Sequence, residues 1–316
     1  MIEVYRKRVE DKRIKKIKNF EKGSWIKMIN PKNGEIKKII GEFKIPEDFV
    51  RASLDEDEKP RIENEDGIVF IVLRFPYKIE KKNRKGKDLR FETLPLGIIL
   101  VKENIITISK VRNNILEDFA EEKIKDWHTT KRHRFLLQIL YRMDKYYLNS
   151  LNEIEKDIES VEKEIRKTQK SKYVIKMLDM QKSLVFFDTS IAANGTVIEK
   201  ILRGNRLKLF DEDVDLLENI IIENKQALEM TKVYRDIVNN TTHAYSSLIS
   251  NRMSRIVKFL TSVTLIVTIP VAVASLYGMN VNLPLQNHPY AFWIVTGGSL
   301  IIATFLGILF YKLDLL

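Results

Sequence analysis

The residues of this chain that could act chemically are neutral ones within an uncharged segment. Residues 259–311 form a run of 53 positions without Asp, Glu, Lys or Arg, and Tyr277-Gly278-Met279-Asn280 lies inside it. Hydroxyl side chains recur at every seventh position before and within the run: Ser247, Ser254, Thr261, Thr268 and Ser275. On a helix this spacing makes one slowly drifting polar stripe, which can line a water-filled path or, alternatively, assist helix packing.

The composition excludes most other chemistry. There is no cysteine, so disulfides and thiolate metal sites cannot form, and the four histidines have no zinc-binding spacing. We find no nucleophile–base set and no phosphate-binding loop, so we do not expect an enzyme. The net charge of +11 is compatible with nucleic-acid binding. However, no zinc finger or aromatic-interleaved RNA motif accompanies the basic residues, and we expect no nucleic-acid partner.

The uncharged run predicts the elements that position these groups. It is long enough for two bilayer crossings of about 20 residues each. We place them at 259–277 and 291–311, with a loop at 278–290 between them. Basic residues precede the first crossing and follow the second, whereas the loop has none, so the positive-inside tendency predicts cytoplasmic N- and C-termini. This is the pattern of a multi-pass protein of the cell membrane.

The preceding 258 residues have a different character, since more than a third of them are charged. Residues 1–112 show β-type runs separated by turn signals and predict an α/β domain. The runs are Trp25–Ile29, Ile36–Ile40, Ile68–Phe75, Pro95–Val101 and Ile105–Ser109. Pro46-Glu47-Asp48 predicts the start of a short helix that ends near Leu54. With no apolar signal peptide at the N-terminus, we expect this part to stay in the cytoplasm.

Helical periodicity replaces the strand pattern from Ile115 onward and predicts a helical hairpin over 113–210. One apolar stripe consists of Leu136, Leu140, Met143, Tyr147, Leu151, Ile154, Ile158, Val161 and Ile165. A second helix is predicted at 172–203, with a possible break at Asn194-Gly195. The acids after residue 210 predict the start of a stalk helix at 211–277, roughly 100 Å long, that continues into the first crossing.

The predicted fold is therefore an α+β cytoplasmic domain followed by two C-terminal transmembrane helices and a short tail at 312–316. The cytoplasmic part combines an α/β sheet unit with a long helical bundle. In a symmetric ring, one first-crossing helix per subunit would present Ser254, Thr261, Thr268 and Ser275 toward the axis. Three apolar residues near its cytoplasmic end, Met253, Val257 and Leu260, could then form a gate that closes by dewetting.

The tetrapeptide at the end of the first crossing resembles the motif of the CorA family of magnesium transporters. The resemblance extends to Leu260-Thr261, to the proline within the crossing, and to Pro60-Arg61-Ile62-Glu63 followed by Val69–Leu73. It implies a funnel-shaped homopentamer whose first crossing lines the pore, with Gly278, Met279 and Asn280 at the outer mouth. Asn280 and backbone carbonyls would hydrogen-bond the waters of a hydrated Mg²⁺, Gly278 would let the chain turn, and Met279 would pack.

The resemblance also implies closure when cytoplasmic Mg²⁺ binds between subunits. Each candidate carboxylate is also typical of a solvated surface acid. The candidates fall into two groups: one group is Asp55, Asp57 and Glu58, and the other is Asp213, Asp215 and Glu218. Three features depart from the family. The loop after the motif has no acidic residue, the basic C-terminal tail is reduced to Lys312, and the proline of the first crossing is shifted by one position.

The function that this resemblance implies is influx of Mg²⁺ driven by the membrane potential, with Co²⁺ and Ni²⁺ as further candidate ions. Mg²⁺ would then be both substrate and regulatory ligand. Two alternatives remain open: a zinc-type transporter of the same superfamily, against which Met279 argues, and a non-transporting coiled-coil scaffold anchored in the membrane.

Overall fold

The computed structural model describes residues 1–316 except 84–85, 169–171, 204–209, 286 and 316. The chain forms two compact units, Met1–Thr241 and Thr242–Leu316. Helix α6 (Asp211–Tyr277) contributes to both units, as predicted for the stalk helix.

One mixed sheet of seven strands organises the first unit, in the order β2-β1-β3-β7-β6-β5-β4. The strands are β1 (Ile2–Arg6), β2 (Lys15–Ile17), β3 (Trp25–Ile29), β4 (Arg61–Glu65), β5 (Ile68–Asn83), β6 (Gly86–Val101) and β7 (Asn104–Ser109). Strands β3 and β7 pair in parallel, and the other described pairs are antiparallel. Four of the five predicted β runs fall in β3, β5, β6 and β7.

The fifth predicted run, Ile36–Ile40, is wrong because it lies in helix α1 (Asn33–Phe43). Ile36, Ile39, Ile40 and Phe43 follow i, i+3, i+4, i+7 spacing, which places them on one helical face. Ile39 and Phe43 are buried on that face. The short helix predicted after Pro46 is confirmed as α2 (Glu47–Ala52).

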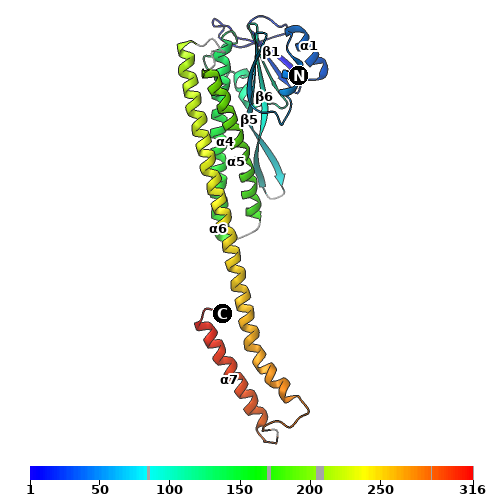
Figure 1. Ribbon diagram of the computed structural model, residues 1–316, viewed down its shortest axis with the longest axis vertical. Coiled ribbons are helices and arrows are strands. Elements are labelled where there is room, and N and C mark those ends of the chain that lie inside the picture. The colour runs from blue at the N-terminus through cyan, green and yellow to red at the C-terminus, as the bar shows by residue number, and fades with distance from the viewer. Residues whose placement is uncertain (84–85, 169–171, 204–209, 286, 316) are drawn as a thin grey trace. The chain divides into compact units, whose positions relative to one another are not determined.

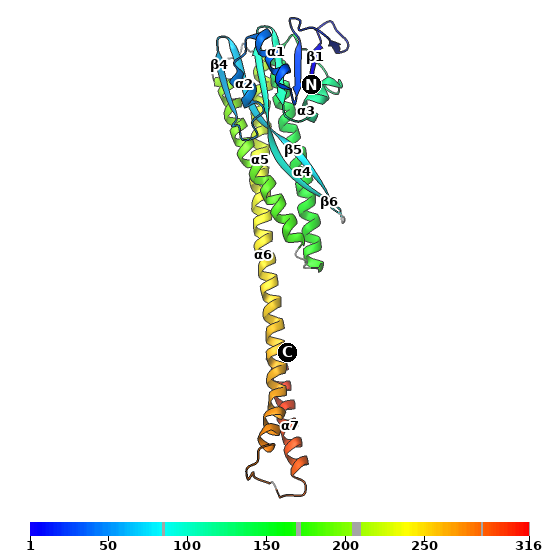
Figure 2. The ribbon, with the colours of Figure 1, turned by 90° about the vertical axis from the view of Figure 1, so that its right-hand side faces the viewer.

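The two faces of the sheet are covered by different helices, as Figures 1 and 2 show. Helices α1 and α2 bury one face in an apolar core that includes Ile26 and Met28 of β3. The alternate β3 residue Trp25 lies on the opposite face, because side chains alternate along a strand. There its ring contacts Trp127 and Phe135, close to Phe119 of helix α3 (Asn114–Ala120).

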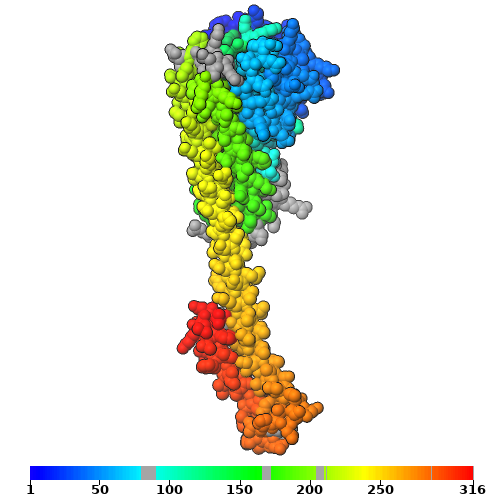
Figure 3. All heavy atoms as spheres, in the orientation of Figure 1, coloured from blue at the N-terminus to red at the C-terminus, as the bar shows by residue number. Residues whose placement is uncertain are grey.

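Two long helices, α4 (Arg132–Thr168) and α5 (Lys172–Arg203), run beside the N-terminal part of α6 in the first unit (Figure 1). All nine members of the predicted apolar stripe on α4 are buried. Helix α6 is tied to α4 by Lys145 and Glu223 at 2.7 Å, and to α5 by Arg235 and Asp188 at 2.6 Å. Figure 3 shows the yellow surface of α6 against the green surface of α5.

The predicted break at Asn194-Gly195 is wrong, since α5 is continuous there. Asn194 is almost fully buried and bridges to strand β5. Its Oδ1 accepts the backbone N–H of Arg74 at 3.0 Å, and its Nδ2 donates to the Arg74 carbonyl at 2.7 Å. The asparagine therefore anchors the helix to the sheet.

The second unit is an antiparallel pair of apolar helices. It contains the C-terminal part of α6, a loop after Tyr277, and α7 (Ala291–Lys312). Both α6 and α7 contain a stretch long and apolar enough to cross a membrane, judged by length and composition.

Candidate ion pathway

The apolar part of α6 has two distinct faces in the second unit. One face packs against α7 and the chain end: Ser262 is 4% exposed, and its Oγ donates a hydrogen bond to the Leu315 carbonyl at 3.0 Å. On α7, Ser299 and Ala303 are buried, and a Cβ on Gly307 would lie 3.7 Å from the Ile266 side chain of α6. This face holds the two helices together.

The residues predicted to line a pore are not covered by α7. Thr261, Thr268 and Ser275 are exposed beside the covered positions of α6, whereas Ser254 lies in the stretch 246–261, where every residue is exposed. The three predicted gate residues, Met253, Val257 and Leu260, lie in the same stretch and are more than half exposed. An apolar helix surface that is left uncovered is available to lipid or to further copies of the chain.

Two threonine hydroxyls on this face, those of Thr264 and Thr268, are placed to act as acceptors. Thr268 donates its proton to the Thr264 carbonyl at 2.7 Å, and Thr264 donates to the Leu260 carbonyl at 2.8 Å. A hydroxyl that donates to its own helix keeps oxygen lone pairs for another partner. The waters around a metal cation direct their hydrogens outward, so such oxygens can receive hydrogen bonds from them. The sequence indicated Thr268 but missed Thr264, which is not on the seven-residue repeat.

The tetrapeptide begins at the C-terminal end of α6, where helix carbonyls are left unpaired and the dipole is negative. Tyr277 donates its hydroxyl to the Pro284 carbonyl at 3.0 Å and so fixes one side of the loop. The Gly278 N–H donates to the Ala274 carbonyl at 3.0 Å and extends the last helical turn. Met279 and Asn280 follow and are exposed. The motif is thus a short cap on the apolar helix.

The sequence predicted that Gly278 lets the chain turn, but the backbone at this position does not require a glycine. Its φ is not positive, and a Cβ at this position would lie 3.5 Å from the Ala274 and Ser275 carbonyl oxygens, which is ordinary van der Waals contact. The backbone of the single chain would accept alanine here, because only a left-handed φ or a close approach makes glycine necessary.

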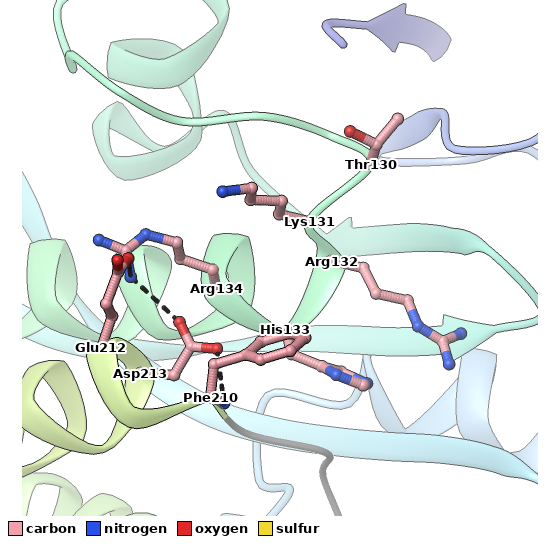
Figure 4. A pocket seen from close by; sticks show the side chains of 8 residues that line it. All are labelled: Thr130, Lys131, Arg132, His133, Arg134, Phe210, Glu212 and Asp213. Atoms are coloured by element: carbon pink, nitrogen blue, oxygen red, sulfur yellow. Dashed lines mark hydrogen bonds and ion pairs between the residues drawn. The ribbon is translucent and has the colours of Figure 1, made fainter. Parts of the chain in front are cut away.

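The candidate regulatory carboxylates are in the first unit, and two of them already have cationic partners. Asp213 is 3% exposed, so it is not a solvated acid. It forms an ion pair with Arg134 at 3.2 Å and accepts the backbone N–H of Phe210 at 3.2 Å. Figure 4 shows Asp213 and Glu212 beside Arg134 in a pocket of about 690 Å³. Glu58 similarly pairs with Arg61.

The other four candidates are more accessible. Asp55, Asp57, Asp215 and Glu218 are exposed, and Asp55 accepts the backbone N–H of Asp57 at 3.1 Å in the turn after α2. Among the residues that the structure describes, no three His, Asp or Glu side chains converge as a metal site within one chain.

Comparison with known proteins agrees with this architecture. The chain is 27% identical over 290 residues to the cobalt/magnesium transport protein CorA of Methanocaldococcus jannaschii, covering 86% of this chain and 84% of that protein. It is 22% identical over 298 residues to the protein of the same name from Thermotoga maritima, covering 92% and 82% of the two chains. The complete CorA structure from M. jannaschii superposes with a TM-score of 0.83 at 23% identity, over 99% of this chain and 98% of that one.

The resemblance drawn from the tetrapeptide is confirmed by a family model. The model of the CorA-like Mg²⁺ transporter protein matches residues 20–312. The chain belongs to this family.

Proposed function

We propose that this protein is a channel-like importer of Mg²⁺, driven by the membrane potential and assembled as a homopentamer in the cell membrane with both termini in the cytoplasm. Co²⁺ and Ni²⁺ are further candidate ions. The observation that carries the proposal is the uncovered hydroxyl face of α6, which ends at Gly278-Met279-Asn280. Two relatives named as cobalt/magnesium transport proteins support the choice of ion.

Recognition of a hydrated ion suits the groups on this face. Mg²⁺ releases its waters reluctantly and prefers oxygen ligands in octahedral geometry. Five copies of Asn280 and of the carbonyls at the end of α6 would accept hydrogen bonds from those waters without a full negative charge. A neutral ring binds weakly enough for the ion to leave. Threonine and serine oxygens would continue the same contacts along the pore.

Closure by cytoplasmic Mg²⁺ completes the proposal. Asp55, Asp57, Asp215 and Glu218 are exposed, and they become the candidate ligands at an interface between copies. Asp213 and Glu58 instead neutralise Arg134 and Arg61 in each chain. Loss of the shared ion would loosen the ring, and the apolar residues Met253, Val257 and Leu260 would separate and admit water.

The direct test is Mg²⁺ influx into vesicles that contain the purified protein. Asn280→Ala should abolish influx and leave the oligomer intact in size-exclusion chromatography. Asn282→Ala is the matched control, since Asn282 is exposed two positions further along the same loop. Normal influx through the Asn280 variant would exclude the proposed role of the motif.

The same vesicles separate the two alternatives. Zn²⁺ influx that Mg²⁺ does not reduce would favour a zinc-type transporter. An absence of flux for any divalent ion, together with an intact oligomer, would favour the scaffold.

A further inference from the structure

A buried carboxylic acid lies at the contact between α4 and α6. Asp144 is 2% exposed and Asn224 of α6 is 5% exposed. The Asn224 Nδ2 donates to Asp144 Oδ1 at 3.1 Å, and among the described residues Asp144 Oδ2 has no hydrogen-bond partner. The neighbouring turns are apolar, with Leu140 on α4 and Ile220 on α6 also buried. The carboxyl group is therefore shielded from bulk solvent.

Helix α5 supplies the space for this contact. A Cβ at Gly195 would lie 2.6 Å from Asn224 Oδ1, too close for a side chain to be tolerated without movement. The absence of a side chain at Gly195 thus lets the Asn224 amide sit between α4 and α5. At this contact each of the three helices contributes one residue: Asp144, Gly195 and Asn224.

The charged groups around Asp144 do not neutralise it. On α6, Glu223 is acidic, and its carboxylate pairs with Lys145 of α4 at 2.7 Å. On α4, Tyr147 is buried and donates to the Arg74 carbonyl, and on α5 the nearby polar residue is uncharged Asn194. Burial, reinforced by Glu223, raises the pKa of Asp144 from 3.8 to about 8.

We propose that Asp144, Gly195 and Asn224 form a proton-dependent lock that clamps α6 to α4 and α5, and that release of α6 is coupled to loss of the Asp144 proton. An unpaired carboxylate in an apolar contact is far costlier to bury than the neutral acid. The lock lies in the first unit and is independent of the proposed ion pathway. If that pathway is correct, the same helix carries its lining residues, and cytoplasmic pH becomes an input to gating.

The direction of the pH dependence follows from proton linkage. The closed contact keeps the proton at pH values where a solvated aspartate has lost it. The closed state therefore binds more protons than the open state between about pH 4 and pH 8, and its stability falls as pH rises through that window. Above the folded-state pKa both states are ionised, and the dependence levels off.

Hydrogen exchange of the full-length protein tests the lock. The rates for peptides covering 217–231 should be compared at each pH between wild type and Asp144→Asn, which cancels the intrinsic effect of pH on exchange. The asparagine is isosteric and does not titrate. The ratio of wild-type to variant exchange should rise by about tenfold per pH unit well below pH 8, and by about 50-fold in total from pH 6 to pH 8, because opening releases one proton until the closed state itself ionises.

Two further variants keep the test decisive if Asp144→Asn folds poorly. Asn224→Ala removes the hydrogen bond of the lock but retains the buried acid, so its peptides should exchange faster than wild type at each pH while the pH slope remains. Glu159→Gln removes an exposed α4 carboxylate and should match wild type. Thermal unfolding of the same proteins from pH 5 to pH 9 gives an independent slope. A ratio that does not change between pH 6 and pH 8, or an Asn224→Ala protein without the slope, would overturn the proposal.

Discussion

Two adjacent hydroxyl residues on α6 should have different roles, one in packing against α7 and the other in ion permeation. Substituting each residue separately distinguishes the packing face from the proposed pore face. Ser262 faces α7 and is 4% exposed, whereas the preceding residue, Thr261, is exposed. We consider Ser262→Ala and Thr261→Val, because each removes a hydroxyl with little change in size.

The structure sets the size of each effect. Ser262→Ala removes the donor to the Leu315 carbonyl and should destabilise the α6–α7 pair by about 0.5–1 kcal/mol, typical of a side-chain hydrogen bond within a membrane. Thr261→Val should cost the single chain almost nothing, since its hydroxyl is exposed there. It should instead reduce Mg²⁺ influx by about tenfold, equivalent to about 1.4 kcal/mol in the barrier, as one acceptor per subunit is lost.

The assays are thermal unfolding of the protein in detergent and Mg²⁺ influx into vesicles at equal protein content. The predicted pattern is a lowered unfolding temperature with retained flux for Ser262→Ala, and the reverse for Thr261→Val. Unchanged flux through Thr261→Val would show that the hydroxyl stripe has no part in permeation. Equal destabilisation by both changes would show that the two faces are wrongly assigned.

Two other predictions concern the first unit. Gly97→Ala should destabilise the protein by about 1–3 kcal/mol in denaturant unfolding, because the new methyl would overlap the side chain of Ser53, the residue that follows α2. Gly41→Ala, with open space around it in α1, should be neutral or stabilising by up to about 1 kcal/mol. Equal effects would contradict the close packing of Ser53 on β6. Millimolar Mg²⁺ should slow proteolysis of the wild type and protect the double variant Asp57→Asn, Asp215→Asn less, as measured by gel densitometry; full protection of the double variant would remove these carboxylates from the regulatory site.

Much of the architecture could be predicted because its signals are local. The nine apolar residues of α4 recur at helical spacing, and all of them are buried. The acids after residue 210 and the absence of proline up to Pro270 predicted one long helix, which runs from Asp211 to Tyr277. Strands β3 and β7 were found from short apolar runs that are bounded by turn residues.

The errors arose where a local pattern had two meanings. Ile36–Ile40 is apolar enough for a strand, but its helical spacing and the packing of Phe43 and Ile39 under the sheet decide for a helix. Asn194-Gly195 is a common turn signal, yet Arg74 of β5 and Asn224 of α6 use these two residues as tertiary contacts. By its position, Asp213 is typical of an acid at the start of a helix. In the folded chain, however, it is buried and forms an ion pair with Arg134 of α4.

By itself, the sequence determined which segments are apolar, which are charged, and where the hydroxyl stripe and the tetrapeptide lie, since these depend on order and spacing along one helix. Only the tertiary structure decided which face of α6 is covered and which is open, because that depends on where α7 packs. It also placed Asp144 opposite Asn224, 80 residues later, in a contact that buries both side chains. Burial changes the protonation of that acid, and no spacing along the chain reports burial.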